Sequence, residues 1–192
     1  MSRNNVYLGL LHHPVYNKNM EVITTSITNL DLHDIARSSS TYGVARYYVI
    51  HPVEAQQNLA KRILGYWTEG FGANYNPDRY QAFQVLRLVR ELQEALDEVE
   101  AEWGRKPVLI TTDARTYPNS ISYVRLREQI EYKDRPYFIL FGTGWGMIKE
   151  LMEKADYILE PIYGPGEYNH LSVRSAVAII LDRLLGEPWF SK

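Results

Sequence analysis

Short apolar runs alternate along this chain with longer segments in which apolar residues recur every three or four positions. Five of the runs are rich in β-branched and aromatic residues and end at proline, glycine or a polar residue, which is typical of buried strands. These predicted strands cover residues 6–14, 45–52, 107–112, 136–142 and 156–161.

The intervening segments have the spacing of amphipathic helices. The predicted helices cover residues 32–42, 53–66, 79–103, 121–132 and 171–185, and a further helical pattern begins at Met147. Gly43 closes the first helix, and Ser120 is the predicted cap of the fourth. Strands that alternate with helices predict an α/β fold: one domain over residues 1–192, with a mostly parallel sheet of five to six strands and helices on both faces.

Residues 68–77 follow neither period and are predicted to form a loop. Glycine and asparagine are interspersed there with aromatic residues. Aromatic side chains in such a loop can stack on an unpaired base of RNA. Core packing and contacts between subunits are the alternative explanation for them.

The fourth predicted strand ends in three glycines at alternate positions, Gly142, Gly144 and Gly146. Glycine lets the backbone approach a ligand closely, and a loop between a strand and a helix is where open α/β sheets bind ligands. A tight turn without a ligand is the alternative, because short glycine motifs often match by chance. A P-loop is disfavoured because Met147 and Ile148 follow in place of lysine and serine or threonine. A Rossmann fingerprint is disfavoured because the loop comes so late in the chain.

Composition narrows the possible classes of function. The 192 residues are 45% hydrophobic and 23% charged, as in an ordinary globular protein, and the absence of cysteine excludes disulfides and thiolate metal sites. Neither a signal peptide nor an apolar run of membrane-spanning length is apparent, so we expect a cytoplasmic protein without a membrane partner. The net charge of −2 is not that of a protein that coats nucleic acid, so an RNA partner would have to meet a local basic patch.

The five histidines have no metal-ligand spacing, and we expect no metal site. His12 and His13 end one predicted strand and His51 ends another. We therefore expect these side chains to lie near one another at the carboxyl edge of the sheet.

Three segments, in this order, resemble the motifs of the SPOUT superfamily of RNA methyltransferases. Residues 31–44 place Arg37 on the first helix, six residues before Gly43. Residues 138–146 resemble the family's glycine loop, and residues 169–181 resemble its last motif, a Leu-polar-Val sequence that opens an apolar helix. Together with the strand order, the resemblance extends over nearly the whole chain. It is strongest to a small bacterial group of predicted RNA methyltransferases that also occurs as a domain joined to tRNA guanine-N1 methyltransferase.

This resemblance implies an enzyme that uses S-adenosylmethionine to methylate tRNA or rRNA and works as a homodimer. It also implies a C-terminal trefoil knot, which is a rare topology. The chain departs from the family pattern at Asp31, His33, Gly144, Ser172 and Arg174, where Asn, Gly, Glu, Asn and Ser are usual. Those usual polar residues belong to the branch that methylates the ribose 2′-oxygen, so the target atom, a ribose oxygen or a base nitrogen, stays open.

The resemblance also implies which residues hold the cofactor. Main-chain groups in two loops would bind its adenine and ribose. These groups belong to Leu140, Gly142, Thr143, Gly144, Ile158, Pro161, Ile162 and Leu171. Ser172 would cap the last helix beside the ligand, or be a plain N-cap, and Ala176 would leave room under the adenine. Thr111 would line the same pocket, or simply end its strand with a satisfied hydroxyl.

Arg37 is the candidate catalytic residue. Methyl transfer needs the acceptor in line with the methyl group, so much of the catalysis is positioning. Because arginine keeps its proton, we expect Arg37 to clamp a phosphate or a developing oxyanion and not to act as a base. His170, near the cofactor loop, is an alternative proton acceptor. Without the resemblance, an ordinary surface arginine would be the simpler explanation of Arg37.

The sequence is compatible with three functions. An RNA methyltransferase is preferred. A module that binds S-adenosylmethionine and docks RNA or a protein without catalysis is favoured by the departures from the motifs and opposed by Arg37. A flavodoxin-like nucleotide-binding protein would explain the sheet but not the late glycine loop.

Overall fold

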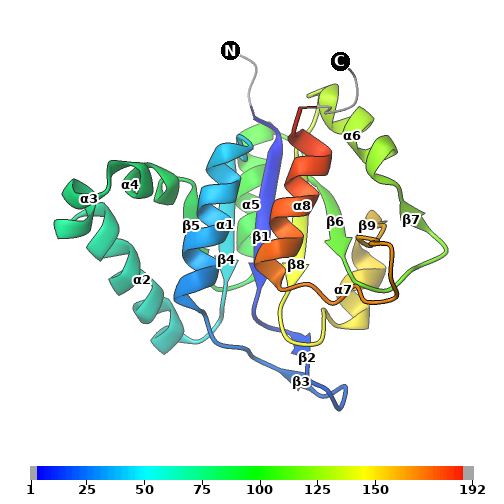
Figure 1. The fold of residues 1–192 in the computed structure, drawn as a ribbon, viewed down its shortest axis with the longest axis horizontal. Coiled ribbons are helices and arrows are strands. Elements are labelled where there is room, and N and C mark those ends of the chain that lie inside the picture. Colours follow the sequence, from blue (N-terminus) through cyan, green and yellow to red (C-terminus); the bar gives the residue numbers. More distant parts are fainter. Residues whose placement is uncertain (1–3, 188–192) are drawn as a thin grey trace.

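Parallel strands form one large sheet at the centre of the molecule (Figure 1). The computed structural model describes residues 4–187. The seven strands of the large sheet lie in the order β5-β4-β1-β8-β6-β9-β7. Their bounds are β1 Val6–Leu11, β4 Arg46–Ile50, β5 Leu86–Val89, β6 Val108–Thr112, β7 Ser120–Ile121, β8 Tyr137–Gly142 and β9 Tyr157–Leu159. Every neighbouring pair is parallel, so all of these strands end at the same edge of the sheet. A separate antiparallel hairpin consists of β2 Val15–Tyr16 and β3 Val22–Ile23.

Helices cover both faces of the sheet, as the sequence predicts. One face carries α1 Asn29–Thr41, α6 Tyr123–Glu131 and α8 Val173–Leu185, and the other carries α5 Leu92–Trp103 and α7 Lys149–Lys154. Successive side chains of a strand point to opposite faces. In β1, Leu8 and Leu10 therefore join the core under α1 and α8, whereas Tyr7 and Leu11 join the core under α5 and α7.

Three helices between β4 and β5 form a helical lobe beside the sheet. They are α2 Glu54–Thr68, α3 Phe71–Tyr75 and α4 Pro77–Phe83, and in Figure 1 they stand at the left, outside the two helical layers. The loop predicted over residues 68–77 is therefore wrong, because the segment contains α3 and the start of α4. Asn76 caps α4 by accepting a hydrogen bond from the Arg79 N–H at 3.0 Å, and Pro77 suits the first turn of that helix.

The long helix predicted over residues 79–103 is also wrong. The chain forms α4, then strand β5, and then α5. Leu86 and Val89, the two buried residues of β5, are three positions apart, which imitates helical spacing. This segment is a strand because it pairs in parallel with β4 at the edge of the sheet, and the local sequence pattern does not indicate that pairing.

A second strand that the sequence analysis missed is β7, which pairs with β9. Ser120, the predicted helix cap, lies in this strand, and Ser122 caps α6 instead by accepting a hydrogen bond from the Arg125 N–H. With β5 and β7 the sheet has seven strands where five to six were predicted. The trefoil knot stays a prediction.

Candidate cofactor site and acceptor side

Three of the predicted cofactor residues lie side by side in one row across the sheet. Thr111 of β6 is paired with Leu140 of β8 on one side and with Ile158 of β9 on the other. All three are buried, and the Leu140 and Ile158 side chains belong to the core under α5 and α7. The Thr111 hydroxyl contacts the Tyr157 carbonyl at 3.5 Å, so its side chain is used within the sheet. The row places the ends of three adjacent strands, and the loops that follow them, together.

The glycine loop after β8 is fixed against the β2–β3 hairpin. Tyr16 accepts a hydrogen bond from the Trp145 N–H at 2.9 Å and donates one to the Gly146 carbonyl, also at 2.9 Å. Gly144 has a φ of +61°, and a Cβ there would lie 2.8 Å from the Tyr16 carbonyl oxygen. Glycine is therefore required by contact with the protein itself. The Thr143 hydroxyl donates to the Leu11 carbonyl at 3.0 Å, which anchors the loop to β1.

The loop after β6 carries an ion pair that sequence analysis missed. The Asp113 carboxylate accepts hydrogen bonds from the Arg115 Nε at 3.0 Å, the Arg115 Nη2 at 2.7 Å and the Tyr117 hydroxyl at 3.1 Å. Burial alone would raise the pKa of Asp113, but the hydrogen bonds from Arg115 and Tyr117 outweigh it and lower this pKa. A Cβ on Gly146 would lie 3.7 Å from Arg115 Nη2, so the pair adjoins the glycine loop.

The loop after β9 crosses the loop after β6 on its way to α8. The Asn169 side-chain amide donates to the Ala114 carbonyl at 2.6 Å, and the hydroxyls of Thr116 and Tyr163 lie 2.7 Å apart. At the start of this loop Pro161 is buried and Ile162 packs against the core. Within residues 4–187, no hydrogen bond uses the Pro161 carbonyl or the peptide groups of Ile162. These groups are free to meet a ligand.

A cavity of about 570 Å³ opens beside these loops. Its walls come from the loop after β6, the segment that follows the glycine loop, and the hairpin. The principal lining residues are Tyr16, Met20, Arg115, Tyr117, Met147, Met152 and Ile158. Ile158 is the one predicted cofactor residue that lines the cavity; the methionines and tyrosines gave no recognisable signal in the sequence.

The remaining predicted cofactor residues belong to the start of α8. Ser172 is its N-cap and accepts a hydrogen bond from the Ser175 N–H at 3.3 Å, Leu171 is 42% exposed, and Ala176 is half-buried. Because α8 packs on the face of α1, Ala176 lies on the other side of the sheet from the Leu140 and Ile158 side chains. The predicted set is thus spread over both sides of the carboxyl edge.

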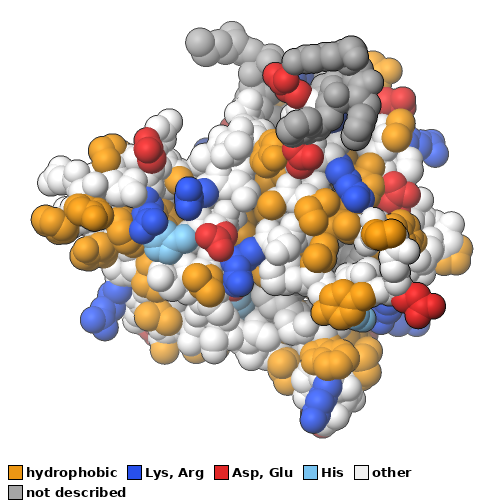
Figure 2. Space-filling view, viewed as in Figure 1, with side chains coloured by type: hydrophobic (Ala, Val, Ile, Leu, Met, Phe, Trp, Pro, Cys, Tyr) orange, Lys and Arg blue, Asp and Glu red, His pale blue; other side chains and the backbone are white. Residues whose placement is uncertain are grey.

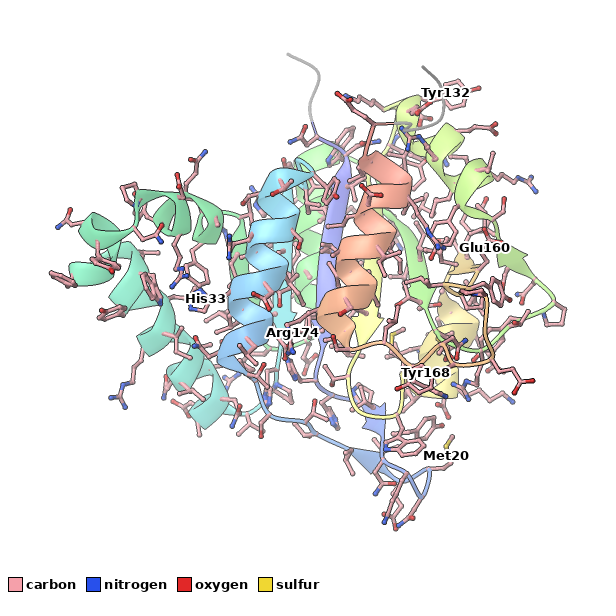
Figure 3. The ribbon with its side chains drawn as sticks, viewed as in Figure 1. Met20, His33, Tyr132, Glu160, Tyr168 and Arg174 are labelled. Carbon is pink, nitrogen blue, oxygen red and sulfur yellow. The ribbon has the colours of Figure 1, made fainter. Side chains whose placement is uncertain are left out.

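Two departures from the family motifs bind each other. Arg174 Nη1 donates to Asp31 Oδ1 at 3.0 Å, and Arg174 Nε lies 3.4 Å from Asp34 Oδ2. Asp31 also accepts a hydrogen bond from the Thr28 hydroxyl at 2.6 Å, at the N-terminus of α1. Figure 3 shows Arg174 between α1 and α8. The ion pair joins these two helices.

Arg37 is exposed on α1 and makes no hydrogen bond or ion pair within the part of the chain that the structure describes. It lies eight residues after Asn29, about 12 Å along the helix at 1.5 Å per residue. Arg37 thus lies about two turns beyond the beginning of α1, which adjoins the strand ends.

The predicted meeting of strand-end histidines is confirmed for His12 and His51, whereas His13 Nδ1 lies by the Ile23 carbonyl and the Thr24 hydroxyl of the hairpin region. The rings of His12 and His51 are 5.4 Å apart, and His12 Nδ1 lies 3.1 Å from the Thr25 hydroxyl. Burial, with His51 as a further cause, lowers the pKa of His12 to about 4, so this side chain is neutral. Within residues 4–187, no group of three or more histidine or acidic side chains could hold a metal ion, and no helix has the length and hydrophobicity to cross a membrane.

Comparison with known proteins defines the class and then the family. The SpoU methyltransferase AviRb of Streptomyces viridochromogenes, whose structure is a complex with the cofactor AdoMet, matches with a TM-score of 0.56 and 15% identity, over 95% of this chain and 58% of that one. The fold is thus that of the SpoU-type methyltransferases.

Similarity in sequence shows the family to which the chain belongs. A family model described as SAM-dependent RNA methyltransferase matches residues 5–186, and the chain belongs to this family. An uncharacterized protein of Aquifex aeolicus is 50% identical over 184 residues, which are 96% of this chain and 90% of that protein. A tRNA (guanine-N(1)-)-methyltransferase of Oleidesulfovibrio alaskensis is 41% identical over 183 residues, 95% of this chain but only 42% of that protein. The chain therefore spans less than half the length of this second relative.

Proposed function

We propose that this RNA methyltransferase binds S-adenosylmethionine at the carboxyl ends of β8, β6 and β9 and methylates a tRNA. The observation that carries the proposal is the row of Leu140, Thr111 and Ile158, whose strands lead into loops with free peptide groups at Gly144 and Ile162. Peptide N–H and C=O groups are the partners that an adenine edge and a ribose require. When bound, the cofactor supplies an electrophilic methyl group on its sulfonium.

The cavity supports a ligand of this size. Small-molecule sites have volumes of about 300–1,000 Å³ and combine apolar walls with a few polar groups. Here about 570 Å³ is lined by methionine, tyrosine and isoleucine side chains, with Arg115, Lys149 and Glu153 among them. Lys149 lies 3.4 Å from Glu153, so Arg115 is the cation that suits the cofactor's carboxylate, and the apolar walls suit its adenine.

Arg115 is the candidate partner of that carboxylate. Asp113 holds Nε and Nη2 of its guanidinium, which leaves Nη1 for a ligand, and the side chain is 56% exposed. A guanidinium held in place by one carboxylate loses little further freedom when it binds another.

Calorimetry tests this site. Arg115→Ala should weaken S-adenosylmethionine binding about 10-fold but leave the binding of 5′-methylthioadenosine, which has no amino-acid tail, unchanged. Arg105→Ala, at an exposed arginine that donates to the Asp134 carbonyl, is the matched control and should change neither. Equal losses for both ligands would contradict the assignment of Arg115, and no binding of either to the wild type would contradict the cofactor site.

The relative from Oleidesulfovibrio supports tRNA as the substrate class. This chain corresponds to a part of a longer protein that is named a tRNA (guanine-N(1)-)-methyltransferase. A domain carried on such a protein would meet the same RNA.

Arg37 acts, in this proposal, on the site of a partner subunit in a homodimer. Its position about 12 Å along α1 and its free guanidinium support this role. Arg37 would hold a phosphate or a developing oxyanion of the acceptor bidentately.

A docking module without catalysis is the competing function, favoured by the ion pair of Asp31 and Arg174 at positions where the motifs carry other polar residues. Transfer of labelled methyl groups to tRNA from cells that lack the protein separates the two. Arg37→Ala should abolish transfer while S-adenosylmethionine affinity stays unchanged. A wild-type protein that binds the cofactor but labels no RNA would favour the docking module.

A further inference from the structure

The helical lobe presents an exposed aromatic surface that the cofactor site does not use. Phe71 and Tyr75 of α3 are 71% and 73% exposed, and Tyr66 of α2 is 50% exposed. Large side chains gathered on a surface in this way mark an interaction site. Figure 2 shows hydrophobic side chains at the outer end of the lobe.

Contacts between the rings hold the side chains of the aromatic surface in place. The rings of Phe71 and Tyr75 stack with centroids 5.8 Å apart and an interplanar angle of 24°, and Tyr66 meets Trp67 edge-on at 5.0 Å. Gly72 lets α3 lie directly on α2, because a Cβ there would be 2.7 Å from the Trp67 ring. Trp67 packs against the core, whereas the stacked Phe71 and Tyr75 side chains stay largely exposed.

Cations accompany these rings. The Arg79 guanidinium lies 4.4 Å from the centroid of the Trp67 ring. Arg62 is exposed four residues before Tyr66 on α2, so the two side chains share one face of that helix. Neither Lys61 nor Arg62 forms an ion pair within residues 4–187, so both are available to phosphates.

The surface continues to Arg37. His33 of α1 packs edge-on against Trp67 at 5.4 Å, and Figure 3 shows His33 on the side of α1 that faces the lobe. Burial lowers the pKa of His33, and the nearby charges of Arg79 and Arg37 lower it further. His33 and Arg37 are four residues apart on α1 and share one face. His33 and Arg79 both contact Trp67, which links the aromatic surface to the acceptor side.

We propose that the helical lobe docks an unpaired segment of the substrate RNA, with bases stacked on Phe71 and Tyr75 and phosphates on Arg62 and Arg79, and delivers it toward Arg37. Exposed rings beside arginines are what a single strand needs, because every base has a face that stacks and every nucleotide carries a phosphate. The inference rests on the proposed function, since the RNA it docks is the methyl acceptor. A protein partner or a second copy of the chain would also use the rings, and the experiments below separate these occupants from RNA.

The test measures binding of a labelled single-stranded 12-nucleotide RNA of mixed sequence. The double variant Phe71→Ala/Tyr75→Ala should weaken binding about 10-fold or more. Tyr132→Ala is the matched control, because Tyr132 is 80% exposed but lies outside the lobe, and its affinity should equal that of the wild type. Arg62→Ala/Arg79→Ala, which removes the two proposed phosphate contacts, should reduce the slope of log affinity against log salt by about 1.4.

S-adenosylmethionine calorimetry and thermal unfolding accompany each variant. RNA affinity lost with cofactor affinity and folding intact supports docking by the lobe. If both double variants keep the wild-type RNA affinity, the docking proposal is wrong. It is also wrong if the wild type binds the cofactor but no RNA. Neither result bears on the cofactor site. If the double aromatic variant instead converts a wild-type oligomer to a monomer at constant RNA affinity, the surface is a self-interface and the proposal is wrong.

Discussion

Asp31 and Arg174 show how two substitutions can compensate each other. Each replaces a polar residue that the motifs usually carry, and each alone would leave a charge near the α1–α8 contact. Together they make a hydrogen-bonded ion pair in which the Asp31 side chain is only 7% exposed. These two departures from the motifs therefore form an ion pair that joins α1 and α8.

Arg174→Ala should destabilise the fold by about 1–3 kcal/mol, because it leaves the buried Asp31 carboxylate without its ion-pair partner. Urea unfolding measures the effect. Arg135→Ala removes an exposed pair with Asp134 and should cost less than about 0.5 kcal/mol. The double variant Asp31→Asn/Arg174→Ser should recover most of the loss; if it is as unstable as Arg174→Ala, the compensation argument fails.

His12 makes the fold sensitive to acid. Its pKa in the folded chain is about 4, against an ordinary 6.5, so between these values the unfolded chain binds a proton that the folded chain does not. Stability therefore falls as the pH decreases through this window, by about 2 kcal/mol between pH 7 and pH 5. His12→Asn, which keeps a polar atom near Thr25, should remove most of this slope in urea unfolding at the two pH values. An unchanged slope would show that His12 is protonated in the folded state.

Among the helices and strands, the sequence predicts those whose conformation depends on a local pattern. It does not predict strands whose conformation depends on pairing with a strand distant in the sequence. The strand runs, the glycine loop and the Ser172 cap of α8 are local features, and the structure contains them. Strand β5 was hidden in a helical spacing because its conformation depends on its partner β4. The pair of Asp113 and Arg115 was missed because two charges two residues apart in a loop are usually solvated.

Substitution of Gly144 tests the glycine loop as an element. Gly144→Val should both strain a backbone at φ +61° and drive a side chain into the Tyr16 carbonyl, so S-adenosylmethionine binding should be lost. Gly104→Val is the matched control, since Gly104 has a φ of +68° with nothing within 4 Å of its Cβ position. Each should lose at least about 1 kcal/mol of stability from backbone strain, and only the first should lose the cofactor. Wild-type affinity in Gly144→Val would separate the loop from the cofactor site.

In the whole molecule, the proposed acceptor residue Arg37 and the proposed cofactor loops belong to different parts of one protomer. Arg37 is far along α1, whereas the free peptide groups adjoin the carboxyl edge of the sheet. The helical lobe contacts α1 through Trp67 and His33, one turn before Arg37. A homodimer in which each chain brings Arg37 and the lobe to its partner's cofactor would resolve this separation.

Mixing two inactive variants tests that arrangement. Arg37→Ala keeps the cofactor site, and Gly144→Val keeps Arg37. Random reassortment of equal amounts makes half of the dimers mixed, each with one complete site, so tRNA methylation should recover to about a quarter of the wild-type rate. Each variant alone is the control. No recovery in the mixture, with mixed dimers demonstrated by mass spectrometry, would place Arg37 and the cofactor in the same chain.

Hydrogen–deuterium exchange, with and without S-adenosylmethionine, tests whether the loops after β8 and β9 bind the cofactor. The amides of Gly144 and Ile162 have no hydrogen-bond acceptor within residues 4–187 and should exchange fast in the free protein. We expect the cofactor to slow exchange in peptides covering residues 142–146 and 161–172 and to leave exchange in the helical lobe unchanged. Binding that protects other segments and leaves these two loops unchanged would contradict this expectation.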